Sequence, residues 1–108
     1  MESNINRDMY KHTGIPCHVI EQIRKIAAER GASKVTLFGS RARGEQHLKS
    51  DIDLAIYGCK DFVQMSFDLD EKLWSLLELD VINMDDEYVS DELVKEIEKD
   101  GIVIYEKI

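Results

Sequence analysis

Two aspartates spaced two residues apart carry the most suggestive chemistry in this 108-residue sequence. Asp51 and Asp53 enclose Ile52 at the start of an alternating run that predicts a strand over residues 51–57. Side chains two residues apart on a strand point to the same face, so both carboxylates can reach one cation. Magnesium prefers hard oxygen ligands and is often held by a few carboxylates, with water and substrate phosphates completing its shell. We therefore expect Asp51 and Asp53 to be metal ligands.

A glycine–serine pair, Gly39-Ser40, follows a strand-like run and is separated from Asp51 by ten residues. Glycine permits backbone geometry that a side chain would block, and a helix that begins at this turn would direct its amides at an anion. Arg41 and Arg43 add cations whose geometry suits phosphate oxygens. No Gly-Lys-Ser/Thr follows, so the turn is not a Walker A loop. We expect Gly39, Ser40, Arg41 and Arg43 to hold phosphates.

A third carboxylate, Asp80, interrupts the apolar run of another expected strand. An unpaired carboxylate is costly among apolar neighbours, which indicates a role for its charge. Together with Asp51 and Asp53 beside a phosphate-holding turn, Asp80 would complete a two-metal site for phosphoryl transfer. His47 lies in the loop between the two motifs, and we expect it to be exposed, with a role toward a substrate as the alternative.

Apolar spacing predicts the elements that must position these residues. Helices are expected from Pro16 to Gly31, over about 61–77, and from an N-cap at Ser90 to Gly101; strands are expected over 34–38, 51–57, 79–84 and 102–106. Helices that alternate with strands, without a linker, indicate one α/β domain over residues 15–108. The polar segment 1–14 is expected to be poorly ordered.

Composition excludes several classes of protein. Hydrophobic residues make up 44% of the chain, enough for a core, and the formal net charge of −8 disfavours a free-standing nucleic-acid binder. The charge is divided unevenly: residues 1–50 carry nine basic and five acidic side chains, whereas residues 51–108 carry five basic and seventeen acidic ones. We expect most of these acids to be solvated helix surface.

Cysteine spacing and hydropathy bear on disulfide or zinc sites and on the cellular location. Cys17 and Cys59 lie far apart and outside any CxxC pattern, which argues against a disulfide framework or a zinc site. No apolar run is long enough to span a membrane, and the N-terminus lacks the apolar core of a signal peptide. We expect a cytoplasmic protein that binds neither membrane nor nucleic acid directly.

The motif Gly39-Ser40, ten residues, then Asp51-x-Asp53, with Asp80 as a third acid, resembles the signature of the polymerase-β-type nucleotidyltransferase superfamily. The fuller form, with Arg41 and Arg43 in the loop, is similar to its minimal nucleotidyltransferase branch. The resemblance covers about residues 15–106. It implies a single α/β (α+β) domain with a mixed sheet of three to four strands, helices packed mainly on one face, and the strands 34–38, 51–57 and 79–84 at its centre.

The same resemblance implies residue roles. Gly39 and Ser40 would hold the triphosphate of ATP. Asp51 and Asp53 would bind two Mg²⁺ ions, and Asp80 would complete one metal site and help activate the attacking hydroxyl. Members of this branch are often encoded beside a HEPN-domain toxin as its antitoxin, and some are implied to transfer AMP to a tyrosine of that toxin. The resemblance therefore implies a protein adenylyltransferase that assembles with a toxin partner.

Two other functions stay open. One is a catalytically silent antitoxin, which would neutralise the toxin by binding alone. The other is a transferase for a small molecule such as an antibiotic, which the absence of an acceptor-binding domain disfavours.

Overall fold

Helices and strands alternate along the part of the chain that the computed structural model describes, residues 10–73 and 78–107. In chain order the elements are the 3-10 helix η1 (Lys11–Thr13), α1 (Cys17–Glu29), β1 (Lys34–Phe38), α2 (Ser40–Arg43), β2 (Ile52–Tyr57), α3 (Phe62–Lys72), β3 (Leu79–Asn83), α4 (Asp91–Asp100) and β4 (Ile102–Glu106). The four strands form one mixed sheet, which confirms the predicted α/β (α+β) class. No helix within these two ranges has the length and apolar character needed to cross a membrane.

The strand order β3-β2-β1-β4 places the two motif strands, β1 and β2, at the centre of the sheet. β1 pairs antiparallel with both β2 and β4, and β2 pairs parallel with β3. The expectation that the strand over 79–84 is also central is wrong, because β3 lies at the edge. β3 adds to the free side of β2, and β4 then pairs with β1, so no strand of the described residues covers the outer side of β3.

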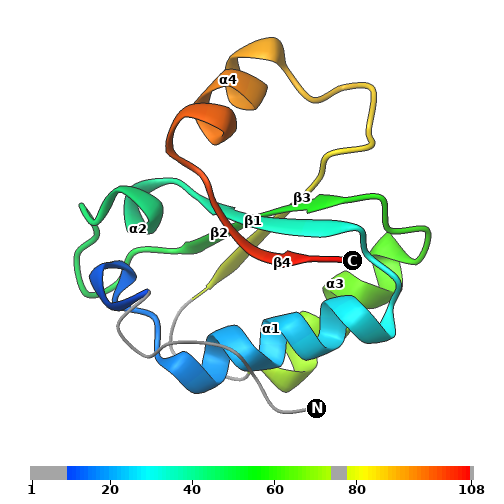
Figure 1. Ribbon diagram of the computed structural model, residues 1–108, viewed down its shortest axis with the longest axis horizontal. Helices are drawn as coiled ribbons and strands as arrows, with labels where there is room; N and C mark the ends of the chain where they lie inside the picture. The colour runs from blue at the N-terminus through cyan, green and yellow to red at the C-terminus, as the bar shows by residue number, and fades with distance from the viewer. Residues whose placement is uncertain (1–9, 74–77, 108) are drawn as a thin grey trace.

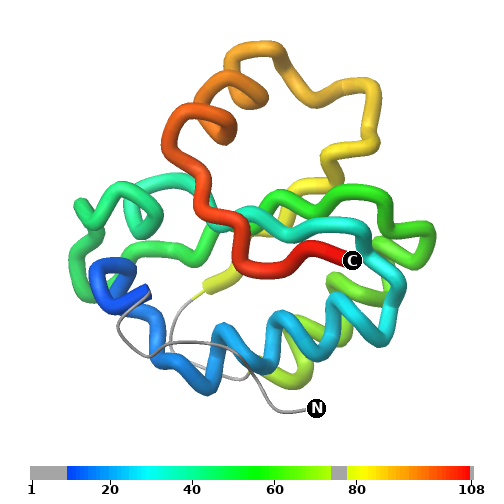
Figure 2. The backbone as a smooth tube through the Cα atoms, in the orientation of Figure 1, coloured from blue at the N-terminus to red at the C-terminus, as the bar shows by residue number. Residues whose placement is uncertain are grey.

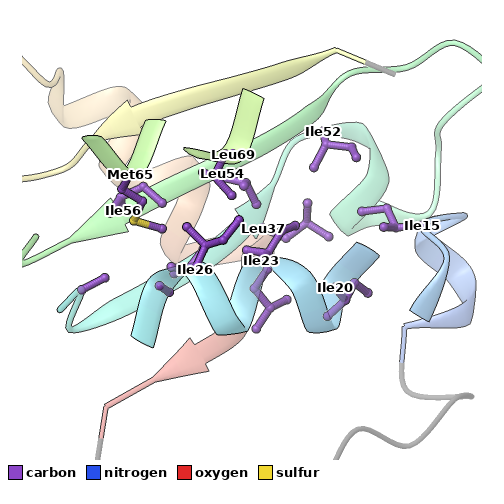
Figure 3. Close-up of a cluster of buried hydrophobic side chains, with 14 of the residues drawn as sticks. Ile15, Ile20, Ile23, Ile26, Leu37, Ile52, Leu54, Ile56, Met65 and Leu69 are labelled. Atoms are coloured by element: carbon purple, nitrogen blue, oxygen red, sulfur yellow. The ribbon is translucent and has the colours of Figure 1, made fainter. Parts of the chain in front are cut away.

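Helices cover the two faces of the sheet unequally. Figure 1 shows α1 and α3 side by side against one face, and Figure 2 shows the chain after β3 swinging out before it returns through α4 on the other. The larger core lies under α1 and α3 and includes the fully buried Ile23 and Leu54 (Figure 3). A smaller cluster of Phe38, Ala55 and Ile97 joins α4 to the opposite face. The packing mainly on one face is therefore confirmed.

The ends of the helices follow the expected capping chemistry in part. Ser90 is the N-cap of α4, and its hydroxyl oxygen accepts a hydrogen bond from the Leu93 N–H at 3.1 Å. The helix predicted over about 61–77 is described as α3 up to Lys72, and residues 74–77 lie outside the described residues.

Residues 10–14 of the N-terminal segment pack against the domain. Tyr10 and Thr13 are buried, and the Thr13 hydroxyl donates to the Tyr10 carbonyl at 2.6 Å. The Thr13 carbonyl in turn accepts from Arg41 of α2 at 2.7 Å. The segment 1–14 is predicted to be poorly ordered, but these buried contacts anchor residues 10–14. Residues 1–9 lie outside the described residues.

Candidate functional site

The Gly39-Ser40 turn joins the end of β1 to the start of α2 and lies against β2. Gly39 has φ 79° and ψ −159°, a backbone conformation that L side chains rarely adopt. A Cβ atom at this position would also overlap the Asp53 carboxylate. Glycine is therefore required here both for conformation and for space. The consequence is that the backbone at the start of α2, where helix N–H groups have no partner within the helix, comes directly beside an acidic side chain.

The sheet register brings two of the three predicted carboxylates into one row. Phe38 pairs with Asp53 across β1 and β2, and Asp53 pairs with Asp80 across β2 and β3. Asp53 is half-buried, whereas Asp80 is exposed at the sheet edge. Asp51, also exposed, stands just before β2, which begins at Ile52 and not at residue 51 as predicted. The row therefore runs from the glycine turn to the edge strand, with Asp51 beyond it along the strand direction.

Electrostatics single out Asp53 among these acids. Burial, followed by the negative charges of Asp80, Asp51 and Glu96, raises the pKa of Asp53 from an ordinary value of 3.8 to about 6, against a smaller lowering by Arg43. An ionised Asp53 is thus costly in the folded protein. A cation bound beside it would offset that cost, which is the behaviour expected of a metal ligand.

A divalent metal fits this donor set. Asp51, Asp53 and Asp80 would supply hard oxygen ligands, and after burial the second cause of the raised pKa of Asp53 is the negative charge of Asp80 and Asp51, which a cation would neutralise. Within residues 10–73 and 78–107, no three His, Cys, Asp or Glu side chains lie close enough together to hold a metal ion, so the three predicted ligands do not form one ready-made cluster. Magnesium is typically held by one or two carboxylates together with water and substrate phosphates, so this arrangement suits Mg²⁺ better than a metal that needs an all-protein cage.

Arg41, predicted to hold phosphate, is buried in the structure and bonded to backbone carbonyls. Its Nε donates to the Ser50 carbonyl at 3.0 Å and its Nη1 donates to the Thr13 carbonyl at 2.7 Å. These two bonds tie α2 to η1 and to the loop that precedes β2. The guanidinium has N–H groups beyond these two, so a phosphate role for Arg41 stays a prediction alongside its structural one.

Arg43, the other predicted cation, is exposed on the side of α2 that faces α4. Its Nε bonds to Glu45 Oε1 at 2.9 Å, and its Nη1 lies 3.8 Å from Glu96 Oε2. The neighbouring acids raise the pKa of Arg43, with the Glu45 hydrogen bond as the largest cause. Arg43 also lowers the pKa of Asp53, so its charge reaches the carboxylate row.

Glu96 is the acid near the site that sequence reasoning missed. It belongs to α4, far downstream of the motif, among acids that resemble ordinary solvated helix surface. Only the return of α4 over the sheet brings it near Arg43 and Asp53. His47 is exposed as predicted, and its backbone N–H donates to the Ser50 hydroxyl at 2.9 Å.

Comparison with known proteins identifies the family and the fold of the chain. The family model described as "Polymerase beta, Nucleotidyltransferase" matches residues 21–108. Among solved structures, a candidate minimal nucleotidyltransferase is similar with TM-score 0.64 and 22% identity, covering 94% of this chain and 98% of that one. A toxin–antitoxin crystal structure with AMP-PNP has TM-score 0.63 and 21% identity, covering 82% of this chain and 73% of that one. A mutant of the toxin–antitoxin pair MntA-HpeT, with two Asp-to-Glu changes two residues apart, has TM-score 0.62, 21% identity and the same coverage. No curated protein sequence matches the chain.

Proposed function

Because the chain belongs to the polymerase β nucleotidyltransferase family, we propose that it is a Mg²⁺-dependent nucleotidyltransferase that acts as an antitoxin, moving AMP from ATP to a tyrosine hydroxyl of a HEPN-type partner toxin. One observation carries the proposal. The backbone of the Gly39-Ser40 turn lies against Asp53, which pairs across the sheet with Asp80. The turn that we propose to hold phosphate and the carboxylate row thus share one end of the sheet, which supports transfer at a phosphorus atom.

Each residue has a role in the proposed reaction. Gly39 and Ser40 would bind the β- and γ-phosphates through backbone N–H groups and the serine hydroxyl. Asp51, Asp53 and Asp80 would hold Mg²⁺, which would neutralise charge on the attacking and leaving oxygens when bound. The acceptor oxygen forms a bond to the α-phosphorus while the bond from that phosphorus to the bridging oxygen breaks, and pyrophosphate leaves. Asp80, at the open edge of the sheet, would take the hydroxyl proton.

The partner is proposed from the resemblance and from the similar structures. Two of the similar structures are described as toxin–antitoxin complexes, and one of them contains AMP-PNP. The described part of this chain offers one helix, α4, above the face that carries Asp53 and Asp80. A protein acceptor brings its own folded surface, so it needs less enclosure from the transferase than a small molecule does.

The test is AMP transfer to the protein encoded by the adjacent reading frame. Purified chain, Mg-ATP and that protein should yield a mass increase of one or more AMP groups on the partner, together with release of pyrophosphate. Changing Asp51→Asn and Asp53→Asn together should abolish the increase, because a neutral amide is a poor ligand for Mg²⁺. No mass increase with the unchanged chain would contradict the proposed activity.

A matched control separates catalysis from a loss of surface charge. Asp70→Asn with Glu71→Gln removes the same two negative charges from the exposed face of α3 and should leave transfer unchanged. The silent-antitoxin alternative makes the opposite prediction: neutralisation of the toxin in cells would survive the Asp51/Asp53 double substitution.

A further inference from the structure

A second feature at this end of the molecule is a pocket that includes Arg41 and Asp51 but is lined mostly by residues without a nucleotide or metal role. It has a volume of about 1020 Å³ and lies between the α2–β2 loop, the chain that leads into α1, and the residues just before β2 and β3. The pocket borders Asp51 and Glu78, whereas Gly39 and Ser40 are not among the described residues that line it. It therefore reaches one predicted metal ligand, Asp51, and one predicted phosphate-binding residue, Arg41, without including the Gly39-Ser40 turn.

The pocket lies next to the carboxylate row, at the first residues of β2 and β3. The Ile52 N–H donates to the Glu78 carbonyl at 2.9 Å, which continues the parallel pairing of β2 and β3 to their first residues. Asp51 and Glu78 each precede by two residues the paired acids Asp53 and Asp80. A group in the pocket is therefore next to the carboxylate row without crossing the sheet.

The loop that forms one wall of the pocket is tied in place. Gln46 Nε2 donates to the His12 carbonyl at 3.0 Å, and Arg41 bonds to the carbonyls of Thr13 and Ser50. These bonds hold both ends of the loop segment 46–50 against η1 and α2. A wall held in this way loses little conformational freedom when a ligand binds, which favours affinity.

The chemistry of the wall indicates the kind of ligand. Leu48 is 89% exposed, which leaves a large apolar side chain without cover at the rim. Its neighbours His47 and Lys49 are exposed, and Lys49 gives this rim a positive charge, whereas Asp51 and Glu78 place negative charge where the lining meets the starts of β2 and β3. The surface of the pocket is mostly apolar. A complementary ligand has an apolar group to cover Leu48 and an acidic group to face Lys49.

In-line geometry decides which substrate the pocket suits. The attacking and leaving oxygens lie on opposite sides of the phosphorus, so an acceptor must approach from the side away from the pyrophosphate. If pyrophosphate leaves at Gly39 and Ser40, the acceptor arrives from the side of Asp51. At about 1020 Å³, the pocket is slightly larger than the range of about 300–1,000 Å³ that is usual for small-ligand sites, which suits a segment of polypeptide.

We propose that this pocket binds the acceptor protein through a hydroxyl-bearing segment with apolar and acidic neighbours, which pack on Leu48 and face Lys49. The inference rests on the proposed function and adds to it a recognition surface for the acceptor. Leu48 and Lys49 are binding residues in this assignment and take no part in the bond changes at phosphorus.

The test compares Leu48→Asp and Lys49→Glu with two controls of matched chemistry away from the pocket. Val63→Asp alters a comparably exposed apolar residue on α3, at 81% exposure, and Lys95→Glu reverses an exposed lysine on α4. For each variant, titration calorimetry measures the Kd for the purified adjacent-gene partner and, separately, the Kd for Mg-AMP-PNP. Each pocket variant should weaken partner binding by about tenfold or more, as for a residue central to an interface, and leave AMP-PNP binding unchanged. The controls should change neither value.

The outcomes separate this inference from the proposed activity. Unchanged partner affinity in both pocket variants would overturn the inference, as would a wild-type chain that does not bind the partner. Weakened AMP-PNP binding with unchanged partner binding would also overturn it, and would assign the pocket to the nucleoside. A wild-type chain that binds the partner but transfers no AMP contradicts the proposed activity, and the partner Kd values still decide the role of the pocket.

Discussion

Replacing Asp53 by asparagine should make the metal-free protein more stable at neutral pH while removing its function. Burial, and then the charges of Asp80 and Asp51, raise the pKa of Asp53 to about 6 from 3.8. The folded state therefore binds this proton more tightly than the unfolded state does. Stability falls as pH rises from about 4 to about 6, and above that range the ionised carboxylate is a constant cost. Asp53→Asn removes the cost because the amide stays neutral.

The size of the effect follows from the same shift. A difference between about 6 and 3.8 corresponds to about 3 kcal/mol by linkage, at the usual 1.36 kcal/mol for each pKa unit. Asp53 is only half-buried, so solvent screening reduces this upper bound to about 1–2 kcal/mol. For a domain of this size, about 1 kcal/mol moves the Tm by roughly 4–8 °C. The expected increase in Tm at pH 7 is therefore on the order of 5–10 °C.

The assay is thermal denaturation of the metal-free protein between pH 4 and pH 8. Asp53→Asn should exceed the wild type in Tm at pH 7, and the two curves should converge near pH 4, where the wild-type carboxyl is protonated. Added Mg²⁺ with AMP-PNP should raise the Tm of the wild type and leave that of the variant unchanged. Asp70→Asn, an exposed change on α3, controls for general loss of charge. A variant that is less stable than the wild type at pH 7, or a difference that is constant with pH, would refute the reasoning.

Three further predictions concern the residues that support the site. Arg41→Met leaves two buried carbonyls without their donor and should lower the free energy of unfolding by about 2–4 kcal/mol in urea titrations; full stability in the variant would argue against the structural role. Gly39→Ala should destabilise the fold because of its positive φ and its overlap with the Asp53 carboxylate, and Asp53→Ala should recover the part due to overlap in a double-mutant cycle. The hydrogen bond from Arg30, at 2.6 Å, lowers the pKa of Asp68. This pair therefore stabilises the fold above the ordinary aspartate pKa, and the stabilisation is lost as pH falls through the lowered value. Asp68→Asn should reduce this loss of stability at acidic pH, as measured by denaturation at a series of pH values.

Local patterns predicted the fold because most of its elements are decided by near neighbours. The alternating strand residues, the N-cap at Ser90 and the helix that follows Pro16 can all be found within a few positions along the chain. The edge position of β3 depends instead on a competition between the two sides of the sheet for β4, which pairs with β1 and leaves the outer side of β3 uncovered by any described strand. No local pattern records that competition, so the central position expected for this strand was wrong.

The candidate site also has one part that local sequence predicts and another that depends on the tertiary structure. Asp51 and Asp53 are close in sequence, and their spacing is enough to place them together, whereas the pairing of Asp53 with Asp80 depends on the parallel register of β2 and β3. The burial of Arg41 could not be predicted, because its partner carbonyl on Thr13 comes from a segment without a clear pattern. Glu96 reaches the site only through the return of α4 across the sheet.

The close approach of Gly39 to Asp53 explains both the position of the Asp53 carboxylate and its cost to the stability of the metal-free protein. A side chain at residue 39 would push the carboxylate away, and a fully exposed Asp53 would have little reason for a raised pKa. Glycine allows the carboxylate to sit half-buried beside the start of α2, where its negative charge adds to that of Asp80. A bound cation would offset the cost of the buried Asp53 charge and the repulsion from Asp80 and Asp51 that the metal-free protein must tolerate. The Asp53 charge that destabilises the metal-free protein therefore favours binding of the metal that the proposed reaction needs. Substitutions at Asp53 that increase stability should weaken metal binding.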